Sequence, residues 1–211
     1  MKIAITSDLH GKLPEVPEAD MLVIAGDVCP TWRTSVQRCM FRQAQWLQEE
    51  FDPWVLRAPV QQVVFVWGNH DFVGHTDYYV PINKAILLKP WQPVFINGLS
   101  WLGNPWTREF GNWAFNMKEE ELDDKWAECD PVDFVVSHGP PLGYGDIVPG
   151  GERVGSEGFA RYIAMHQPSV ALYGHIHCDT GEWELGRSRL INNAYVDDRH
   201  EPQNPVRVIE L

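Results

Sequence analysis

The sequence contains few cysteines and no apolar run long enough to cross a bilayer. Its four cysteines form no C-x-x-C pair, and a chain of 211 residues can bury a sizeable core without disulfides, so we expect free thiols. The first residues do not form a signal-peptide block, and no later segment has the length of a membrane span. We therefore expect a cytoplasmic protein that does not bind membranes.

Basic residues are also scarce. The chain has 17 Lys and Arg against 29 Asp and Glu, which gives a formal net charge of -12 at pH 7. Long nucleic acids bind through clustered Lys and Arg, so they are not expected partners. An acidic protein can still act on a phosphate group where bound cations supply positive charge locally, which favours a metal site over a basic surface.

Short apolar runs recur along the chain and predict strands at residues 3–6, 21–25, 63–67, 94–96, 134–136, 170–173 and 206–209. Most carry too little polar alternation for a sheet face open to water, so helices should cover the sheets. Helical spacing is found over 36–51 and 159–166, and a third helix is expected with Asn116 as its N-cap. No repeat or linker divides the chain. The predicted fold class is α/β, in a single domain over residues 1–211.

Polar residues directly follow five of these strands. The segments are Asp8-Leu9-His10, Gly26-Asp27, Gly68-Asn69-His70-Asp71, Ser137-His138-Gly139 and Gly174-His175-Ile176-His177. Ligand-binding groups collect beyond the carboxyl ends of strands in α/β sheets, so these segments can converge. A single histidine is more often structural than a ligand, but five of the 8 histidines fall here. Carboxylate, imidazole and amide groups without thiolate favour two divalent or trivalent ions of Mn, Fe or Zn.

The ordered set D-x-H, G-D, G-N-H-D, H-G and G-H-x-H resembles the calcineurin-like metallophosphoesterase superfamily over residues 8–177. Further blocks resemble its metallophosphoesterase-domain-containing (239AB) phosphodiesterase subgroup, namely Asn104-Pro105-Trp106, Asn112-Trp113-Ala114-Phe115-Asn116, the segment 137–143 and Asn192-Asn193-Ala194. The resemblance implies two mixed β-sheets in a sandwich flanked by helices. It also implies two metal ions, one held by Asp8, His10 and His177 and the other by Asn69, His138 and His175, with Asp27 bridging both.

The chemistry expected of such a site is phosphate ester hydrolysis by a metal-bridging hydroxide. The family pattern places His70 beside the metals without ligating them, which makes it the expected general acid. Asp71 is a second catalytic candidate, although an Asp that bonds nearby backbone amides is equally compatible with the sequence. His75, His166 and His200 are expected to be surface or packing residues.

Small phosphodiesters, above all nucleotides including cyclic nucleotides, are the expected substrates, because the subgroup resemblance points to that class. Trp106 and Trp113 could stack on a nucleobase, although a core position is equally compatible with Trp106. Protein phosphatases of the superfamily carry an Asp and an Arg shortly after G-D. In this chain residues 28–33 follow Gly26-Asp27 without that pair, which disfavours phosphoprotein substrates. A nuclease, a broad phosphomonoesterase and a catalytically silent protein-binding scaffold are the alternatives.

Overall fold

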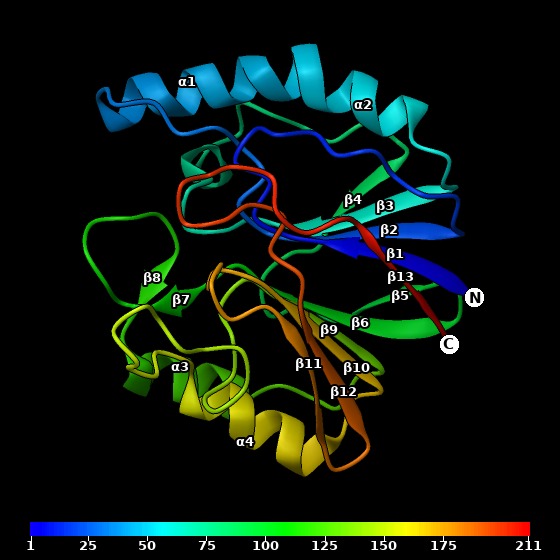
Figure 1. Ribbon diagram of the computed structural model, residues 1–211, viewed down its shortest axis with the longest axis vertical. Coiled ribbons are helices and arrows are strands. Elements are labelled where there is room, and N and C mark those ends of the chain that lie inside the picture. Colours follow the sequence, from blue (N-terminus) through cyan, green and yellow to red (C-terminus); the bar gives the residue numbers. More distant parts are fainter.

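The computed structural model describes all residues from Met1 to Leu211 and consists of two stacked β-sheets with helices on both outer faces (Figure 1). The first sheet has the order β13-β1-β2-β3-β4 and the second the order β11-β12-β10-β9-β6-β5. The first contains β1 Lys2–Thr6, β2 Met21–Ala25, β3 Gln62–Val66, β4 Ala85–Leu87 and β13 Arg207–Glu210. The second contains β5 Val94–Ile96, β6 Leu99–Asn104, β9 Phe134–Ser137, β10 Val170–Tyr173, β11 Gly181–Leu185 and β12 Ser188–Asn192. A small third sheet pairs β7 Thr107–Arg108 with β8 Asn116–Met117.

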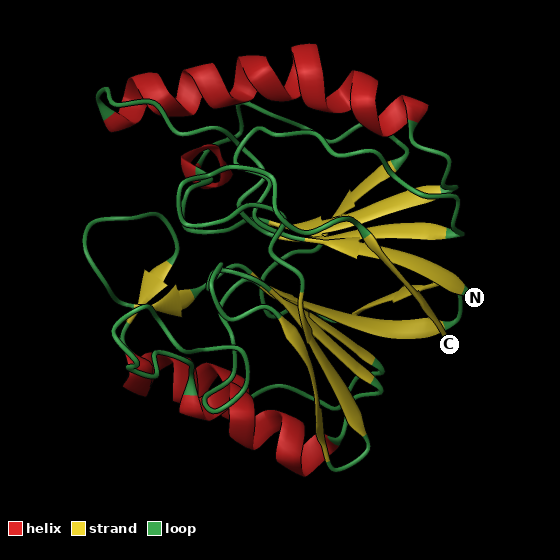
Figure 2. Cartoon of the chain, in the orientation of Figure 1, coloured by secondary structure: helices red, strands yellow, loops and turns green.

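Helices cover the outer face of each large sheet (Figure 2). On the first sheet, α1 Val36–Trp46 runs through a π-helical turn, Leu47–Phe51, into α2 Asp52–Arg57. On the second lie α3 Glu119–Ala127 and α4 Glu157–His166, and a short 3₁₀ helix, Phe72–His75, follows β3. No helix combines the length and apolar character that crossing a membrane requires.

The core between the sheets is built by alternate residues of the strands. Ile3 and Val23 of the first sheet belong to the same buried cluster as Trp101, Phe134 and Leu172 of the second. The remaining strand residues face the helices, with one buried cluster against α1 and α2 and another against α3 and α4. Both faces of each sheet are therefore covered, which accounts for the nearly continuous apolar runs in the strands.

Parallel strands bring their carboxyl ends to one side of the molecule. Strands β1 to β4 are parallel neighbours in the first sheet, and β6, β9, β10 and β12 are parallel neighbours in the second. In Figure 1 the loops that follow these strands gather on the side away from both termini. Segments that lie far apart in the sequence therefore meet there.

The predicted α/β sandwich is confirmed, and all four cysteines are free as expected. The prediction that Asn116 caps a helix was wrong. Helix α3 begins at Glu119 after Lys118, and Asn116 lies in β8, where its Oδ1 accepts a hydrogen bond from Thr107 Oγ1 at 3.2 Å. Pairing with β7, a contact that local sequence cannot reveal, holds Asn116 in extended structure.

Trp101 offers a direct test of the packing between the sheets. Its side chain is 0% exposed and stacks on Phe134 with ring centroids 4.4 Å apart. Trp101→Ala is expected to lower the free energy of unfolding by about 3–5 kcal/mol, because apolar contact is lost and a cavity is left. Phe95, on β5, is 79% exposed, so Phe95→Ala should change the free energy by less than about 0.5 kcal/mol. Urea denaturation measures both, and similar losses in the two variants would contradict this packing.

Candidate metal centre

All seven side chains predicted as metal ligands lie at the shared edge where the parallel strands end. They follow five strands directly: Asp8 and His10 follow β1, Asp27 follows β2, Asn69 follows β3, His138 follows β9, and His175 and His177 follow β10. The first sheet supplies the first four of these residues and the second sheet the last three. The centre therefore exists only where the two sheets are packed together.

The Asp27 carboxylate stands between side chains of the two sheets. Its Oδ2 lies 3.6 Å from His10 Nε2 and 3.4 Å from His138 Nε2. Asn69 Oδ1 lies 2.9 Å from the same His138 nitrogen. The other oxygen, Asp27 Oδ1, accepts the backbone N–H of His70 at 2.7 Å. One carboxylate oxygen is thus placed to be shared between two sites.

The Asp8 carboxylate organises the other half of the centre. Both of its oxygens accept the backbone N–H of His175 at 3.0 Å, and Oδ1 lies 3.3 Å from His177 Nε2. His177 Nε2 is also 3.3 Å from His10 Nε2. His177 Nε2 therefore lies close to both an imidazole nitrogen and a carboxylate oxygen.

Backbone carbonyls fix the orientation of two of these imidazoles. His138 Nδ1 donates to Ala25 O at 2.9 Å, and His177 Nδ1 donates to Asp197 O at 3.0 Å. The remaining nitrogen of each ring, Nε2, is thereby directed at the centre. Metal-binding histidines characteristically use their second nitrogen in this way.

The charge balance of the centre fits a cation. Burial raises the pKa of Asp8, but the hydrogen bond and charge of His177 outweigh it and lower this pKa to about 2. The pKa of Asp27 is also held well below its ordinary value against the effect of burial, chiefly by His138. Both buried carboxylates therefore remain ionised. Burial acts to lower the pKa of His138 and of His177, but Asp27 raises that of His138 to about 9 and Asp8 raises that of His177 to about 9. The protons on these two rings balance the charge of the carboxylates, and metal ions can replace those protons.

Three groups of potential ligand atoms have all members within 4.8 Å of one another: Asp8, Asp27 and His138; His10, Asp27 and His70; and His10, His177 and His200. His175 belongs to none of them, although its ring centroid lies 5.1 Å from that of His138. Burial lowers the pKa of His10 and His175 to about 3, which keeps both rings neutral and able to ligate. His200, which the sequence placed on the surface or in packing, lies inside one of these groups.

A family model described as calcineurin-like phosphoesterase matches residues 1–179. The chain belongs to this family. Buried His and Asp clusters of the kind just described are consistent with the dimetal site typical of calcineurin-like phosphoesterases.

Relatives and a solved structure extend the comparison over the whole chain. Metallophosphoesterase domain-containing protein 1 of Homo sapiens is 26% identical over 242 residues, covering 100% of this chain and 71% of that protein. The UPF0046 protein K07C11.7 of Caenorhabditis elegans is 25% identical over 226 residues, covering 96% of this chain and 72% of that protein. One solved structure superposes with a TM-score of 0.69 at 16% identity and covers 99% of this chain and 98% of its own, which supports the fold alone.

His70 in this phosphoesterase is held by a partner that the sequence did not reveal. Its Nδ1 is bonded to Thr31 Oγ1 at 2.8 Å, and its ring packs against those of His10, at nearly perpendicular planes, and Trp113. The Asp71 carboxylate turns away and accepts the backbone N–H groups of Val28 at 3.1 Å, Cys29 at 2.8 Å and Gly68 at 2.8 Å. The sequence left two roles open for Asp71, and the structure shows the one in which the carboxylate bonds backbone amides. These hydrogen bonds join the loop after β2 to the loop after β3.

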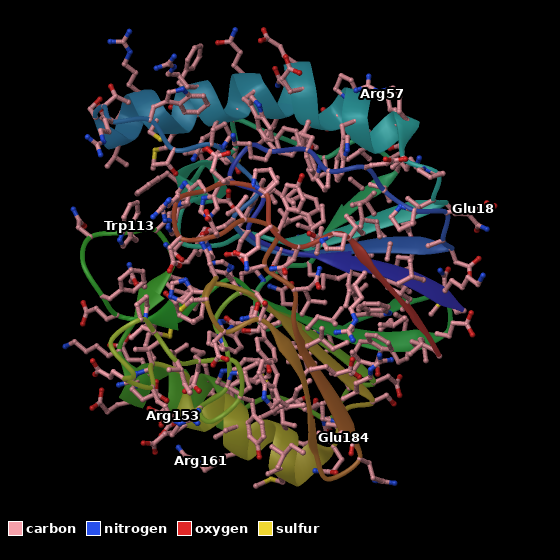
Figure 3. The ribbon with its side chains drawn as sticks, viewed as in Figure 1. Glu18, Arg57, Trp113, Arg153, Arg161 and Glu184 are labelled. Atoms are coloured by element: carbon pink, nitrogen blue, oxygen red, sulfur yellow. The ribbon has the colours of Figure 1, made fainter.

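The two candidate stacking residues occupy different places. Trp113 packs on His70 with ring centroids 4.1 Å apart and lies on the side of the molecule where the strands end (Figure 3). Trp106 packs on Phe115 and also lines a cavity of about 490 Å³ that reaches His175 and His177. Trp106 is therefore the one placed beside a space that an organic group can enter.

Glycine at position 174 allows the Asp8 carboxylate to lie against the backbone. A Cβ at Gly174 would come closer than 3.0 Å to Asp8 Oδ2 and Ser7 Oγ, a contact that real Cβ atoms essentially never make. Gly174→Ala is therefore expected to displace the carboxylate and weaken Mn²⁺ binding by about 10- to 100-fold. Gly150→Ala is the control, because nothing lies within 4 Å of a Cβ there. Calorimetric titration with Mn²⁺ measures the difference, and equal affinities in the two variants would contradict the expected placement.

Proposed function

We propose that this chain hydrolyses small phosphodiesters, with nucleotides including cyclic nucleotides as the main substrate class, using two metal ions drawn from Mn, Fe or Zn. The observation that carries the proposal is the convergence of two buried, ionised carboxylates with imidazoles from both sheets. We assign one ion to Asp8, His10 and His177 and the other to Asn69, His138 and His175, with Asp27 between them. The position of Asp27 Oδ2, 3.6 Å from His10 Nε2 and 3.4 Å from His138 Nε2, supports the bridging assignment.

Metal ions bound here supply a nucleophile from water at neutral pH and positive charge for the phosphoryl oxygens. The side chains of the protein position the phosphate. The neutral rings of His10 and His175 and the oriented rings of His138 and His177 fix the positions at which a phosphate can bind. Asp27 and Asp8 stay ionised, with Asp27 beside the rings of His10 and His138 and Asp8 beside that of His177.

His70 is assigned as the proton donor to the leaving alkoxide. Its Nδ1 is engaged by Thr31, which leaves Nε2 free for the substrate. One of its ring nitrogens lies within 4.8 Å of ligand atoms of His10 and Asp27, so the ring borders the reaction space. Burial lowers the pKa of His70 in the free protein. A bound phosphate anion opposes that effect, because a negative charge nearby favours the protonated ring.

The cavity beside the centre supports a substrate with a second organic group. Its walls include the apolar side chains of Trp106, Pro140 and Phe159, so it can take the part of a diester that a simple monoester lacks. The lining of the cavity carries more acidic than basic residues: the acidic ones are Glu109, Glu152 and Asp198, and Arg108 is its one Arg or Lys. The charge of Arg108 is already paired with Glu119 at 3.2 Å. Negative walls disfavour polyanions such as nucleic acids.

A comparison of substrates tests the proposed class. With Mn²⁺, the kcat/KM for a cyclic nucleotide is expected to exceed that for a phosphoserine peptide or duplex DNA by at least about 10-fold, since base stacking contributes roughly 1–3 kcal/mol. A duplex or phosphopeptide at the top of the ranking would contradict the proposal. Elemental analysis of the same protein provides the control. Protein that binds two metal ions but hydrolyses none of these esters would support the scaffold alternative.

A second experiment tests the role of His70. His70→Asn is expected to retain both metal ions but to lose about 10²- to 10⁴-fold in kcat on alkyl esters, because the alkoxide must leave without a proton. The deficit should shrink for nitrophenyl esters, whose leaving group needs no proton. His166→Asn, on the outer helix α4, serves as the control and should leave kcat unchanged. An equal loss across leaving groups would remove His70 from the proton-donor role.

A further inference from the structure

His200 lies beside the metal centre, in the long segment between β12 and β13. One of its ring nitrogens lies within 4.8 Å of the ligand atoms of His10 and His177. Its ring centroid is 5.8 Å from that of His177 and 5.9 Å from that of His70. The side chain makes no hydrogen bond to any other residue and is only partly buried. An unused imidazole N–H is thus presented next to the proposed reaction space.

The turn that carries His200 is tied to the centre through Asp197. The Asp197 carboxylate accepts the backbone N–H groups of Arg199 at 2.8 Å and Glu201 at 2.9 Å, and its carbonyl accepts the N–H of His200 at 2.8 Å. The same carbonyl accepts the Nδ1 proton of His177 at 3.0 Å. His200 is held at a φ of 59°, a left-handed conformation that most residues avoid. This network fixes the turn that carries His200 relative to a proposed metal ligand.

Ring geometry argues against His200 as a further ligand of the ion that we assign to His10. The rings of His10 and His200 are stacked, with centroids 4.0 Å apart and planes inclined by only 15°. An imidazole ligates through a lone pair that lies in its own plane. Because the two planes are nearly parallel and separated, one ion cannot lie in both. The His200 nitrogen is therefore available to the substrate.

We propose that His200 binds substrate by donating a hydrogen bond to a phosphoryl oxygen held at the metal centre. The inference rests on the proposed function, since it assigns this residue to the same phosphate ester. His70 and His200 border the same space, so the phosphate lies between two imidazoles that do different work. His70 faces the leaving group, whereas His200 contacts an oxygen that stays on phosphorus. Stacking on His10 fixes the direction of the donor.

Two substitutions separate the hydrogen bond from the stacking. His200→Phe keeps a flat ring on His10 but removes both nitrogens, whereas His200→Gln keeps an N–H donor and removes the ring. Inorganic phosphate is titrated calorimetrically into the metal-loaded proteins, and Mn²⁺ affinity is measured separately. Phosphate affinity and kcat/KM for a cyclic nucleotide are expected to fall by about 10- to 100-fold in His200→Phe and by less in His200→Gln, because a hydrogen bond to a charged group is lost only in the former. Mn²⁺ affinity should match that of the wild type, and the control His166→Phe should be unchanged in every measurement.

The results that would overturn the role of His200 differ from those that would overturn the proposed function. Phosphate affinity and kcat/KM in His200→Phe equal to those of the wild type would overturn the inference. So would a loss of Mn²⁺ affinity in that variant, because His200 would then act on the metal ions and not on the phosphate. If the wild type hydrolyses no diester, the proposed function fails, and the phosphate titration still tests whether His200 binds the oxyanion.

Discussion

The burial of two ionised carboxylates is the constraint on which the rest of the structure depends. Asp8 and Asp27 are 0% and 1% exposed, and a buried charge is very unfavourable unless it is paired and hydrogen-bonded. The fold provides both kinds of compensation. Backbone N–H groups of His175 and His70 bond the carboxylates, and imidazoles from the opposite sheet face them. The loops after the strands have to follow the paths that make these contacts possible.

The backbone at these loops adopts conformations that local sequence does not favour. Asp8, His10, Asp27 and His175 all have positive φ, between 45° and 71°, which costs of order 1–3 kcal/mol for a residue with a side chain. A left-handed residue at the end of a strand turns the chain sharply, so that a side chain faces the centre immediately after the last buried strand position. Interactions of the charged groups offset this strain, which explains why it gathers at the centre.

The sequence predicted the parts of the centre that depend on local order along the chain. Each expected ligand comes within a few residues of a strand end, so the strand pattern and the motif locate it together. Thr31, Gln43 and His200 could not be found in this way because tertiary packing brings them in. Gln43 reaches from α1 to donate to His70 O at 2.7 Å, and Thr31 bonds the ring of the same histidine. The turn at Asp197 is set by its own hydrogen bonds, so no hydrophobic period marks His200.

The division of ligands between the sheets joins the proposed chemistry to the stability of the fold. Asp8, His10, Asp27 and Asn69 belong to the first sheet, whereas all the other proposed ligands belong to the second. A metal ion held by both sets binds the folded chain but has no preformed site in the unfolded one, so it stabilises the sandwich by an amount that grows with the logarithm of its concentration. The apolar contact between the sheets holds the two sets of proposed ligands opposite one another, so the packing of the core and the geometry of the centre depend on each other.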